Sequence, residues 1–183
     1  MIIVGVDEAG RGPLVGSVVA AAVILPCKYS LPGLTDSKKL SEKKRLEIYQ
    51  KITQQCQWSM GHSSAEEIDE INILEATMLA MKRAVEKLNV EYDRVLVDGN
   101  RCPALRNCIA IVKGDMKEPA ISAASIIAKV TRDLQMVKLD KMYPQYGFAK
   151  HKGYGTAEHL RALKEFGPIE QHRKSFGPIK KLI

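Results

Sequence analysis

Acidic side chains end or follow three segments that have the character of β-strands. These acids are Asp7, Glu8, Asp98 and Asp115. Functional groups in α/β sheets gather at the carboxyl ends of the strands, so acids placed there can meet. Four crowded carboxylates would repel one another, and hard cations such as Mg²⁺ or Mn²⁺ relieve that repulsion and prefer oxygen ligands. The sequence therefore indicates an all-oxygen magnesium or manganese site.

A plainer interpretation exists for each acid by itself, because an acid at a strand end is often a turn former. Their joint occurrence at three strand ends favours a functional role for the set. Neighbouring residues on a regular strand point to opposite faces, so Asp7 and Glu8 can share a site only if the strand twists or ends there. Gly10 and Gly12 follow closely and make such a distortion possible.

The elements that must position these acids follow from hydrophobic periodicity and from capping residues. The first three strands have short links and can pair antiparallel, whereas the later strands are reached through helices and can lie parallel to the first. The fold class is therefore α/β, with a mixed sheet flanked by helices in one domain. The expected elements are strands at 2–7 and 15–25, a helix from Ser41 to about Cys56, a strand at 57–63, a helix capped by Asn72 and Glu75 that reaches Leu88, strands at 95–98 and 108–113, a helix at 119–142, a loop at 147–155, a helix from Thr156 to about Phe166 and a helical turn at 169–174.

The second long helix carries an apolar stripe, which we expect to pack in the core. The stripe consists of Leu74, Met78, Met81, Val85 and Leu88. These residues recur at a helical period, which places them on one face. Such a stripe is more typical of a core than of a cofactor site.

The net charge of +7 is distributed unevenly along the 183 residues. Residues 1–128 hold 16 basic and 16 acidic side chains, whereas residues 129–183 hold 12 basic and 5 acidic ones. A basic C-terminal third favours contact with a phosphate backbone, although lysine also simply solubilises exposed helices.

Several classes of protein are excluded by what the sequence lacks. No apolar run reaches about 18 residues, which argues against a membrane span. The chain has no His-Glu-x-x-His, P-loop or Gly-x-Gly-x-x-Gly pattern, so zinc proteases and common nucleotide binders drop out. The four cysteines include no Cys-x-x-Cys pair, and the N-terminal apolar run reads as a strand rather than a leader. We therefore expect reduced thiols in a cytoplasmic protein.

Six sequence blocks, in order along nearly the whole chain, resemble bacterial type 2 ribonuclease H. Any one block alone would be a weak signal, whereas six in register are specific. The blocks are Asp7-Glu8-Ala9-Gly10-Arg11-Gly12-Pro13, Asp36-Ser37-Lys38-Lys39-Leu40-Ser41, Val97-Asp98-Gly99-Asn100, Lys113-Gly114-Asp115, the segment 121–133 and Lys152-Gly153-Tyr154-Gly155-Thr156.

The resemblance implies the ribonuclease H fold, a five-stranded mixed sheet with flanking helices. It implies a catalytic core at 1–142 and a basic helical extension at 143–183 within one domain. It also implies cleavage of RNA in RNA–DNA hybrids and incision 5′ of a single ribonucleotide in duplex DNA. Two Mg²⁺ or Mn²⁺ ions about 4 Å apart would serve that hydrolysis and leave 5′-phosphate and 3′-hydroxyl ends.

The resemblance also implies roles for individual residues. Asp7, Glu8, Asp98 and Asp115 would bind the metals. The segment Gly10-Arg11-Gly12 would contact the 2′-hydroxyl of the ribonucleotide, and Tyr154 would sense the sugar that follows it. Lys38 and Lys39 are candidates for contacts with backbone phosphates, although a single lysine of this kind is more often simply solvated.

Asp133 competes with Asp115 for the fourth metal position. At about 1.5 Å of rise per residue, it would lie about 20 Å along the helix from Pro119, too far to join a residue just before that helix. We expect Asp133 to pair with a nearby base instead.

Two other functions are compatible with some of these features. Type 3 ribonuclease H shares the fold, but it usually carries an N-terminal substrate-binding domain for which acids at positions 7 and 8 leave no room. A non-catalytic module that binds hybrids is the second, and the presence of all four carboxylates argues against it. We expect a monomer whose partners are RNA–DNA hybrids and DNA duplexes that contain ribonucleotides.

Overall fold

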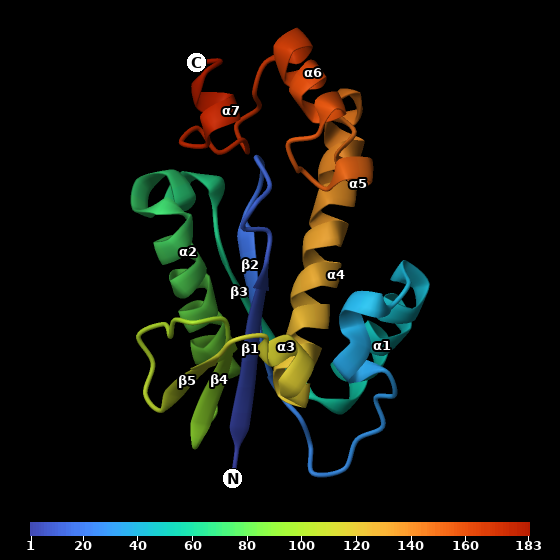
Figure 1. The fold of residues 1–183 in the computed structure, drawn as a ribbon, viewed down its shortest axis with the longest axis vertical. Helices are drawn as coiled ribbons and strands as arrows, with labels where there is room; N and C mark the ends of the chain where they lie inside the picture. The colour runs from blue at the N-terminus through green and yellow to red at the C-terminus, as the bar shows by residue number, and fades with distance from the viewer.

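The computed structural model describes the backbone of residues 1–183 and all side chains except those of residues 35–37, so Asp36 and Ser37 of the second block lie outside the described side chains. Five strands form one sheet in the order β3-β2-β1-β4-β5 (Figure 1). The strands are β1 (Ile3–Ala9), β2 (Val18–Ile24), β3 (Gln57–Ser63), β4 (Arg94–Asp98) and β5 (Cys108–Ile111).

The predicted mixed sheet is confirmed. β1 pairs antiparallel with β2, which pairs antiparallel with β3, whereas β4 lies parallel to β1 and β5 parallel to β4. Val6 of β1 lies opposite Val97 of β4. Asp7 and Asp98 each follow one of these two valines, so the register brings both acids to the same edge of the sheet.

Helices cover both faces of the sheet, with α2 on one face and α4 and α1 on the other (Figure 1). The helices are η1 (Leu34–Lys39), α1 (Glu42–Gln55), α2 (Ala65–Leu88), α3 (Gly114–Lys117), α4 (Pro119–Met142), η2 (Pro144–Tyr146), α5 (Phe148–His151), α6 (Ala157–Phe166) and α7 (Gly177–Lys180). β2 is buried on both sides: Ala20 and Ala22 pack toward α2, and Ala21 and Val23 toward α1 and α4.

The sequence rules for helix ends hold at α1, α4 and α6. The hydroxyl of Ser41 accepts a hydrogen bond from the Lys44 N–H, and that of Thr156 accepts one from the His159 N–H. α4 begins at Pro119 as predicted. A Cβ on Gly5 would lie 2.1 Å from the Ala120 carbonyl carbon, so β1 and the small-residue start of α4 are in backbone contact. This contact fixes α4 beside the acids of β1.

Several expected boundaries are wrong, and one of them is the end of β5, which lies at Ile111 instead of Lys113. β1 continues to Ala9 instead of ending at Asp7, and β2 begins at Val18 because the residues before it bond to the C-terminal segment. α2 begins at Ala65, where Ser64 and Glu67 form a capping box.

The predicted cap at Asn72 exists, but inside α2. Asn72 adopts φ 71° at a kink, and its side-chain oxygen accepts from the Glu75 N–H at 3.0 Å. Just beyond the kink, Leu74 is 38% exposed, so its predicted place in the core is wrong. Met81 and Val85 of the same stripe are buried as expected.

The C-terminal segment builds a third apolar cluster, which lies above the end of β1 in Figure 1. The expected loop at 147–155 contains the short helix α5. The helical turn expected at 169–174 is wrong, because His172 forms a β-bridge with Val15 and Arg173 is hydrogen-bonded to Leu14. No helix in the described part of the chain is long and apolar enough to cross a membrane.

Candidate active site

The four predicted acids come together at the carboxyl ends of β1 and β4. Asp7 and Glu8 lie side by side, and the Glu8 N–H donates to Asp7 Oδ1 at 2.8 Å. The short helix α3 follows β5 and returns Asp115 to Asp98, whose Oδ1 accepts from the Asp115 N–H at 3.3 Å. Strand register and this one helical turn therefore gather residues that are about a hundred positions apart.

Burial makes this cluster electrostatically strained. Asp7 is only 6% exposed, and its pKa is raised well above the ordinary 3.8, first by burial and then by the charges of Glu8 and Asp98. Burial also raises the pKa of Glu8, although a hydrogen bond with Asp7 and the charge of Arg11 act in the opposite direction. Both carboxylates therefore need a positive charge nearby to stay ionised without cost.

Two carboxylate oxygens of the cluster have no hydrogen-bond partner among the described residues. They are Glu8 Oε2 and Asp115 Oδ1, and both are buried. Buried polar atoms are normally satisfied, and bare carboxylate oxygens are the ligands that hard divalent cations prefer. The donor chemistry therefore fits Mg²⁺ or Mn²⁺, although no group of three or more described Asp, Glu, His or Cys side chains is already arranged around a metal position.

Lys38 supplies one positive charge to the cluster. Its Nζ lies 2.8 Å from Asp115 Oδ2, and this hydrogen bond raises the pKa of the lysine, with smaller contributions from Asp98 and Asp7. The side chain of Lys38 is 69% exposed, so the ammonium reaches the acids from solvent. Lys39, the other predicted phosphate contact, is exposed and does not line the groove described next.

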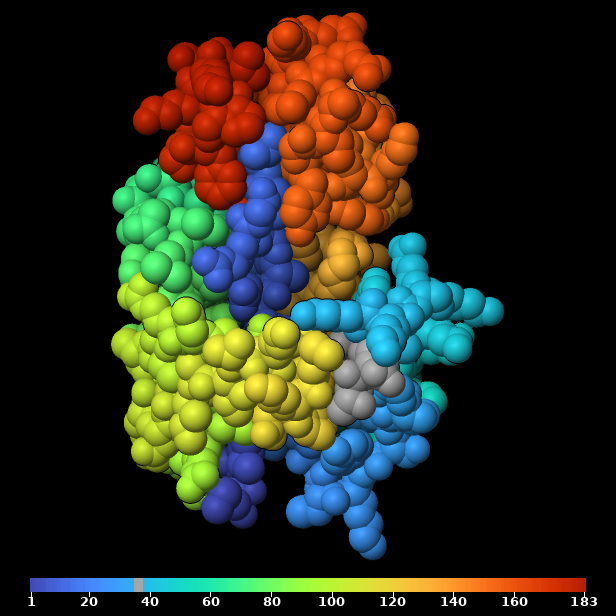
Figure 2. All heavy atoms as spheres, in the orientation of Figure 1, coloured from blue at the N-terminus to red at the C-terminus, as the bar shows by residue number. Residues whose placement is uncertain are grey.

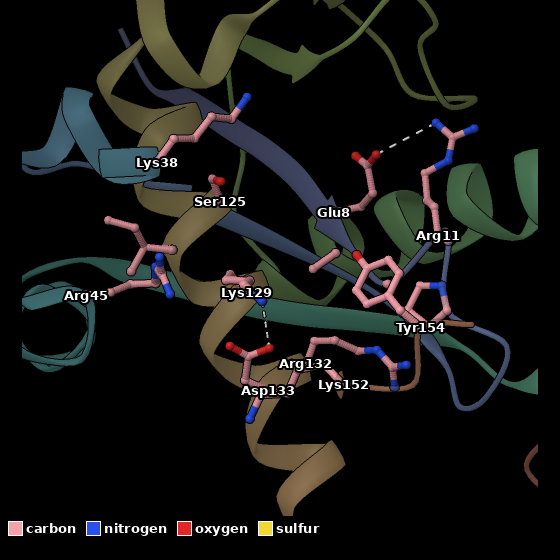
Figure 3. A pocket seen from close by; sticks show the side chains of 15 residues that line it. Glu8, Arg11, Lys38, Arg45, Ser125, Lys129, Arg132, Asp133, Lys152 and Tyr154 are labelled. Carbon is pink, nitrogen blue, oxygen red and sulfur yellow. Dashed lines mark hydrogen bonds and ion pairs between the residues drawn. The ribbon is translucent and has the colours of Figure 1, made fainter. Parts of the chain in front are cut away.

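A groove of about 420 Å³ runs from Glu8 to the C-terminal extension. Figure 2 shows the end of β1 and the following loop, in blue, exposed between the C-terminal extension above and the α3 segment below. Figure 3 shows the lining side chains, among which basic ones outnumber acidic ones. The charged and aromatic lining residues are Glu8, Arg11, Lys38, Arg45, Lys129, Arg132, Asp133, Lys152 and Tyr154.

The predicted sugar-reading residues form one wall of this groove. Gly10 has φ 90°, a conformation that favours glycine, and a Cβ there would lie 2.7 Å from Arg132 Nε. The ring of Tyr154, half exposed, packs over Gly12 so closely that a Cβ would lie 3.2 Å from its Cε1. Arg11 is exposed and lies 3.8 Å from Glu8 Oε1 (Figure 3). The structure thus brings the Gly10–Gly12 segment and Tyr154 into contact.

Asp133 behaves as the helix geometry predicted. It pairs with Lys129 at 2.8 Å on the wall of the groove (Figure 3). The fourth acid beside Asp7, Glu8 and Asp98 is therefore Asp115.

Sequence reasoning did not find the buried arginine that supports this wall. Arg132 is 3% exposed, and its Nη2 donates to the Val15 carbonyl at 2.6 Å. Its Nε and Nη1 have no partner among the described residues, and burial lowers its pKa to about 10. Nothing in the helical pattern separates a buried arginine from an exposed one, although its place in the fifth block was a signal.

The comparisons with known proteins agree with this geometry. The sequence model of the ribonuclease HII family matches residues 4–178. The chain belongs to the ribonuclease HII family. It is 27% identical to the ribonuclease H2 of Pyrococcus horikoshii OT3, with a TM-score of 0.82, and the match covers 100% of this chain and 97% of that one.

Two further solved structures are similar. The ribonuclease HII of Archaeoglobus fulgidus, solved in complex with PCNA, is 26% identical with a TM-score of 0.80, over 96% of this chain and 95% of that one. A Bst ribonuclease HIII solved with Mn²⁺ has a TM-score of 0.81 at 18% identity, covering 100% of this chain and 69% of that one, and shows the shared fold alone.

Membership of the ribonuclease HII family makes this chain a type 2 ribonuclease H, a hydrolase that acts on RNA–DNA hybrids. The type 3 enzyme and the non-catalytic module are thereby set aside.

Proposed function

We propose that the chain incises DNA duplexes 5′ of single embedded ribonucleotides, with Asp7, Glu8, Asp98 and Asp115 holding two Mg²⁺ or Mn²⁺ ions. Ions held by these carboxylates would lower the pKa of the attacking water and stabilise the departing 3′-oxygen, which would give 5′-phosphate and 3′-hydroxyl ends. The carboxylates of this chain fix the positions of the ions relative to the scissile phosphate.

The observation that carries this proposal is the pair of bare carboxylate oxygens on Glu8 and Asp115, in a cluster where burial and mutual repulsion already disfavour ionisation. A stable protein leaves few such groups unsatisfied, and those that remain call for an explanation. Cations with oxygen ligands satisfy both the bare oxygens and the excess negative charge.

The choice of the cleavage site is assigned to the wall formed by Gly10-Arg11-Gly12 and Tyr154. A 2′-hydroxyl both donates and accepts hydrogen bonds, and glycine lets backbone groups approach a sugar closely. The exposed ring of Tyr154 lies directly beside Gly12, where it can pack on the sugar that follows.

The remaining groove supplies affinity for the duplex. Lys38 and the other basic residues that line the groove would contact phosphates, whereas Lys39 lies outside the groove. Binding through phosphate contacts weakens steeply as the salt concentration rises.

We further propose that the chain is one domain, with the catalytic core at 1–142 and the basic extension at 143–183, and that it works as a cytoplasmic monomer.

The test uses two labelled substrates of the same length, a DNA duplex with one ribonucleotide and a duplex with a continuous RNA strand. Each is incubated with the protein and Mg²⁺ or Mn²⁺, and the products are mapped at single-nucleotide resolution. We expect incision 5′ of the ribonucleotide, with a 3′-hydroxyl on the upstream product.

A duplex in which deoxyribose replaces the single ribose is the matched control and should stay intact. Cleavage of the continuous RNA without incision at the single ribonucleotide would overturn the proposed specificity. Incision that survives complete chelation of divalent ions would overturn the metal mechanism.

A further inference from the structure

The C-terminal extension buries a cluster of polar groups directly behind the proposed sugar-reading wall. His172 is 1% exposed and Arg173 is fully buried, although both are polar and adjacent in sequence. Neither touches the four acids. Their hydrogen bonds run instead to the two segments that form the wall, Gly10–Pro13 and the loop around Tyr154.

Arg173 binds the first segment through its carbonyl oxygens. Its Nη2 donates to the Gly10 carbonyl at 2.5 Å, and its Nη1 donates to those of Arg11 at 2.9 Å and Pro13 at 2.8 Å. Its Nε donates to the Gly16 carbonyl at 2.9 Å. A planar fork of donors suits four carbonyls that converge from different directions, which a single ammonium cannot reproduce.

The guanidinium of Arg173 makes these bonds at an electrostatic cost. Among the described side chains no carboxylate forms an ion pair with it. Burial lowers its pKa to about 9, the charge of Arg132 lowers it further, and the charge of Asp69 acts in the opposite direction. A buried charge without an ion partner must be compensated by hydrogen bonds. The shape of the Gly10–Pro13 segment is therefore tied to this one side chain.

His172 reaches the second segment through a chain of ring nitrogens. The Ile169 N–H donates to His172 Nδ1 at 2.9 Å, so the proton of the neutral ring is assigned to Nε2. That Nε2 lies 2.9 Å from His159 Nε2, which must then accept. The proton of His159 is thereby assigned to Nδ1, which donates to the Tyr154 carbonyl at 2.9 Å.

His151 holds the other side of the same loop. Its ring stacks on His159 at a centroid distance of 4.5 Å, and its Nδ1 accepts from the Gly153 N–H at 3.1 Å. Its Nε2 then carries the proton and donates to the Tyr146 carbonyl at 2.6 Å. The backbone around Tyr154 is thus fixed on both sides while its ring stays half exposed.

The two halves of the wall are held by consecutive residues of one segment. This segment is itself tied to the loop before β2, since Val15 and His172 form a β-bridge and the Arg173 N–H donates to the Leu14 carbonyl at 2.9 Å. A shift of this segment would change how Gly12 and Tyr154 lie against each other in the proposed sugar-reading wall.

We infer that His172 and Arg173 are positioning residues that hold the Gly10–Pro13 segment and Tyr154 in register, so that they set the preference for a single ribonucleotide. The inference rests on the proposed roles of that segment and of Tyr154. Neither positioning residue contacts the acids, so the change is expected in selectivity rather than in the chemistry of hydrolysis.

The first test compares two substitutions at His172. Gln can place its amide nitrogen where Nε2–H donates to His159, whereas the shorter Asn cannot reach. We expect His172→Asn to lower the ratio of incision at a single ribonucleotide to cleavage of continuous RNA by about tenfold, and His172→Gln to keep it within about twofold. His62→Asn, at an exposed histidine, is the matched control.

A double-mutant cycle with Tyr154→Ala separates this inference from the proposed function. If His172 acts through Tyr154, His172→Asn has less than about a twofold effect on the ratio once the ring is gone. Independent, multiplicative effects would overturn the positioning role while leaving Tyr154 as a reader of the sugar. A Tyr154→Ala variant with an unchanged ratio would overturn the role of Tyr154 and, with it, this inference.

Arg173→Lys gives a separate test, with Arg94→Lys at an exposed arginine as its control. Thermal melting first identifies whether the Arg173 variant is folded at the assay temperature. A folded variant is expected to lose selectivity by about tenfold, and an unchanged ratio in a folded variant contradicts the inference. If the Arg173 variant is unfolded, the His172 variants and their double mutant with Tyr154→Ala test the inference instead.

Discussion

The acid cluster and the proposed sugar-reading wall lie side by side, yet most of their buried polar groups find partners in different ways. In the acid cluster, Glu8 and Asp115 each retain a bare oxygen among the described residues, and burial raises the pKa of Asp7. Behind the wall, Arg173 uses its donors on four carbonyls, and the ring nitrogens of His159 and His172 all have partners.

The difference separates two kinds of site. A cluster of buried, unpaired carboxylates suits cations that the chain does not itself supply. Without such cations the cluster lowers the stability of the folded state. Behind the wall, the paired donors and acceptors of Arg173 and the histidines hold its backbone in place, although Nε and Nη1 of Arg132 lack partners among the described residues. A backbone held in this way suits the recognition of a sugar by shape and hydrogen bonds. Predictions that change one region and not the other test this contrast.

The largest effect is expected from Asp7→Asn. The substitution removes one carboxylate of the cluster, and we expect cleavage of both ribonucleotide-containing substrates to fall by more than about 100-fold. Hybrid binding, measured by fluorescence anisotropy in the absence of divalent ions, should persist because the groove keeps its basic residues. The variant should also melt at a higher temperature than the wild type without metal, since a buried charge is gone.

Mn²⁺ provides the control for this variant. A ligand that binds only the folded state stabilises it, by about 2.7 kcal/mol at a concentration 100 times its Kd. Mn²⁺ should therefore raise the melting temperature of the wild type more than that of Asp7→Asn. Equal shifts would mean that the metal binds elsewhere.

The next largest effect is on the pH dependence of stability, to which Asp7 and His172 contribute with opposite sign. The raised pKa of Asp7 means that the folded state binds more protons, so its contribution to stability falls as the pH rises from 3.8 through the raised value. Burial lowers the pKa of His172 to about 4 from 6.5, so its contribution falls as the pH drops between those two values.

Thermal melts of metal-free protein between pH 4 and pH 6.5 distinguish the two contributions. His172→Gln does not titrate and should flatten the acid-side loss of stability, which is on the order of 2 kcal/mol in the wild type. Asp7→Asn should leave that acid-side loss in place. Identical profiles for wild type and His172→Gln would contradict the neutral histidine chain.

The smallest effect is expected at Lys38. Its ion pair with Asp115 is largely exposed, so Lys38→Met should change the free energy of unfolding by less than about 1 kcal/mol. Because the ammonium occupies one oxygen of Asp115, its removal should tighten Mn²⁺ binding several-fold in calorimetric titrations. Weaker binding would mean that Lys38 helps to hold the metal site rather than competing for it.

Local rules predicted the strands that carry Asp7 and Asp98, whereas the short helix α3 that returns Asp115 to Asp98 is not among the elements that the sequence predicts. Strand patterns predicted the parallel pairing that brings Asp7 and Asp98 to one edge, and the length of α4 separated Asp115 from Asp133. The caps at Ser41 and Thr156 marked helix starts through hydrogen bonds between near neighbours.

The same local rules failed where contacts between residues far apart in sequence determine the backbone conformation. The segment 169–174 resembles a helical turn, but His172 and Arg173 bond to residues more than 150 positions earlier and extend it. Asn72 and Glu75 predict a helix start at Asn72, whereas the capping box of Ser64 and Glu67, with the same spacing, starts α2 at Ala65. Local patterns therefore do not predict the roles of His172 and Arg173 behind the wall. The residues of the wall itself are predicted by the resemblance of their sequence blocks to a family.

A crystal structure with Mn²⁺ and a duplex containing one ribonucleotide tests the central claim most directly, since anomalous scattering locates manganese independently of the protein. The account predicts manganese bound by Asp7, Glu8, Asp98 and Asp115, with Tyr154 and the Gly10–Gly12 segment on the sugars beside the scissile phosphate. Manganese held by Asp133 instead of Asp115, or bound away from this cluster, would contradict it.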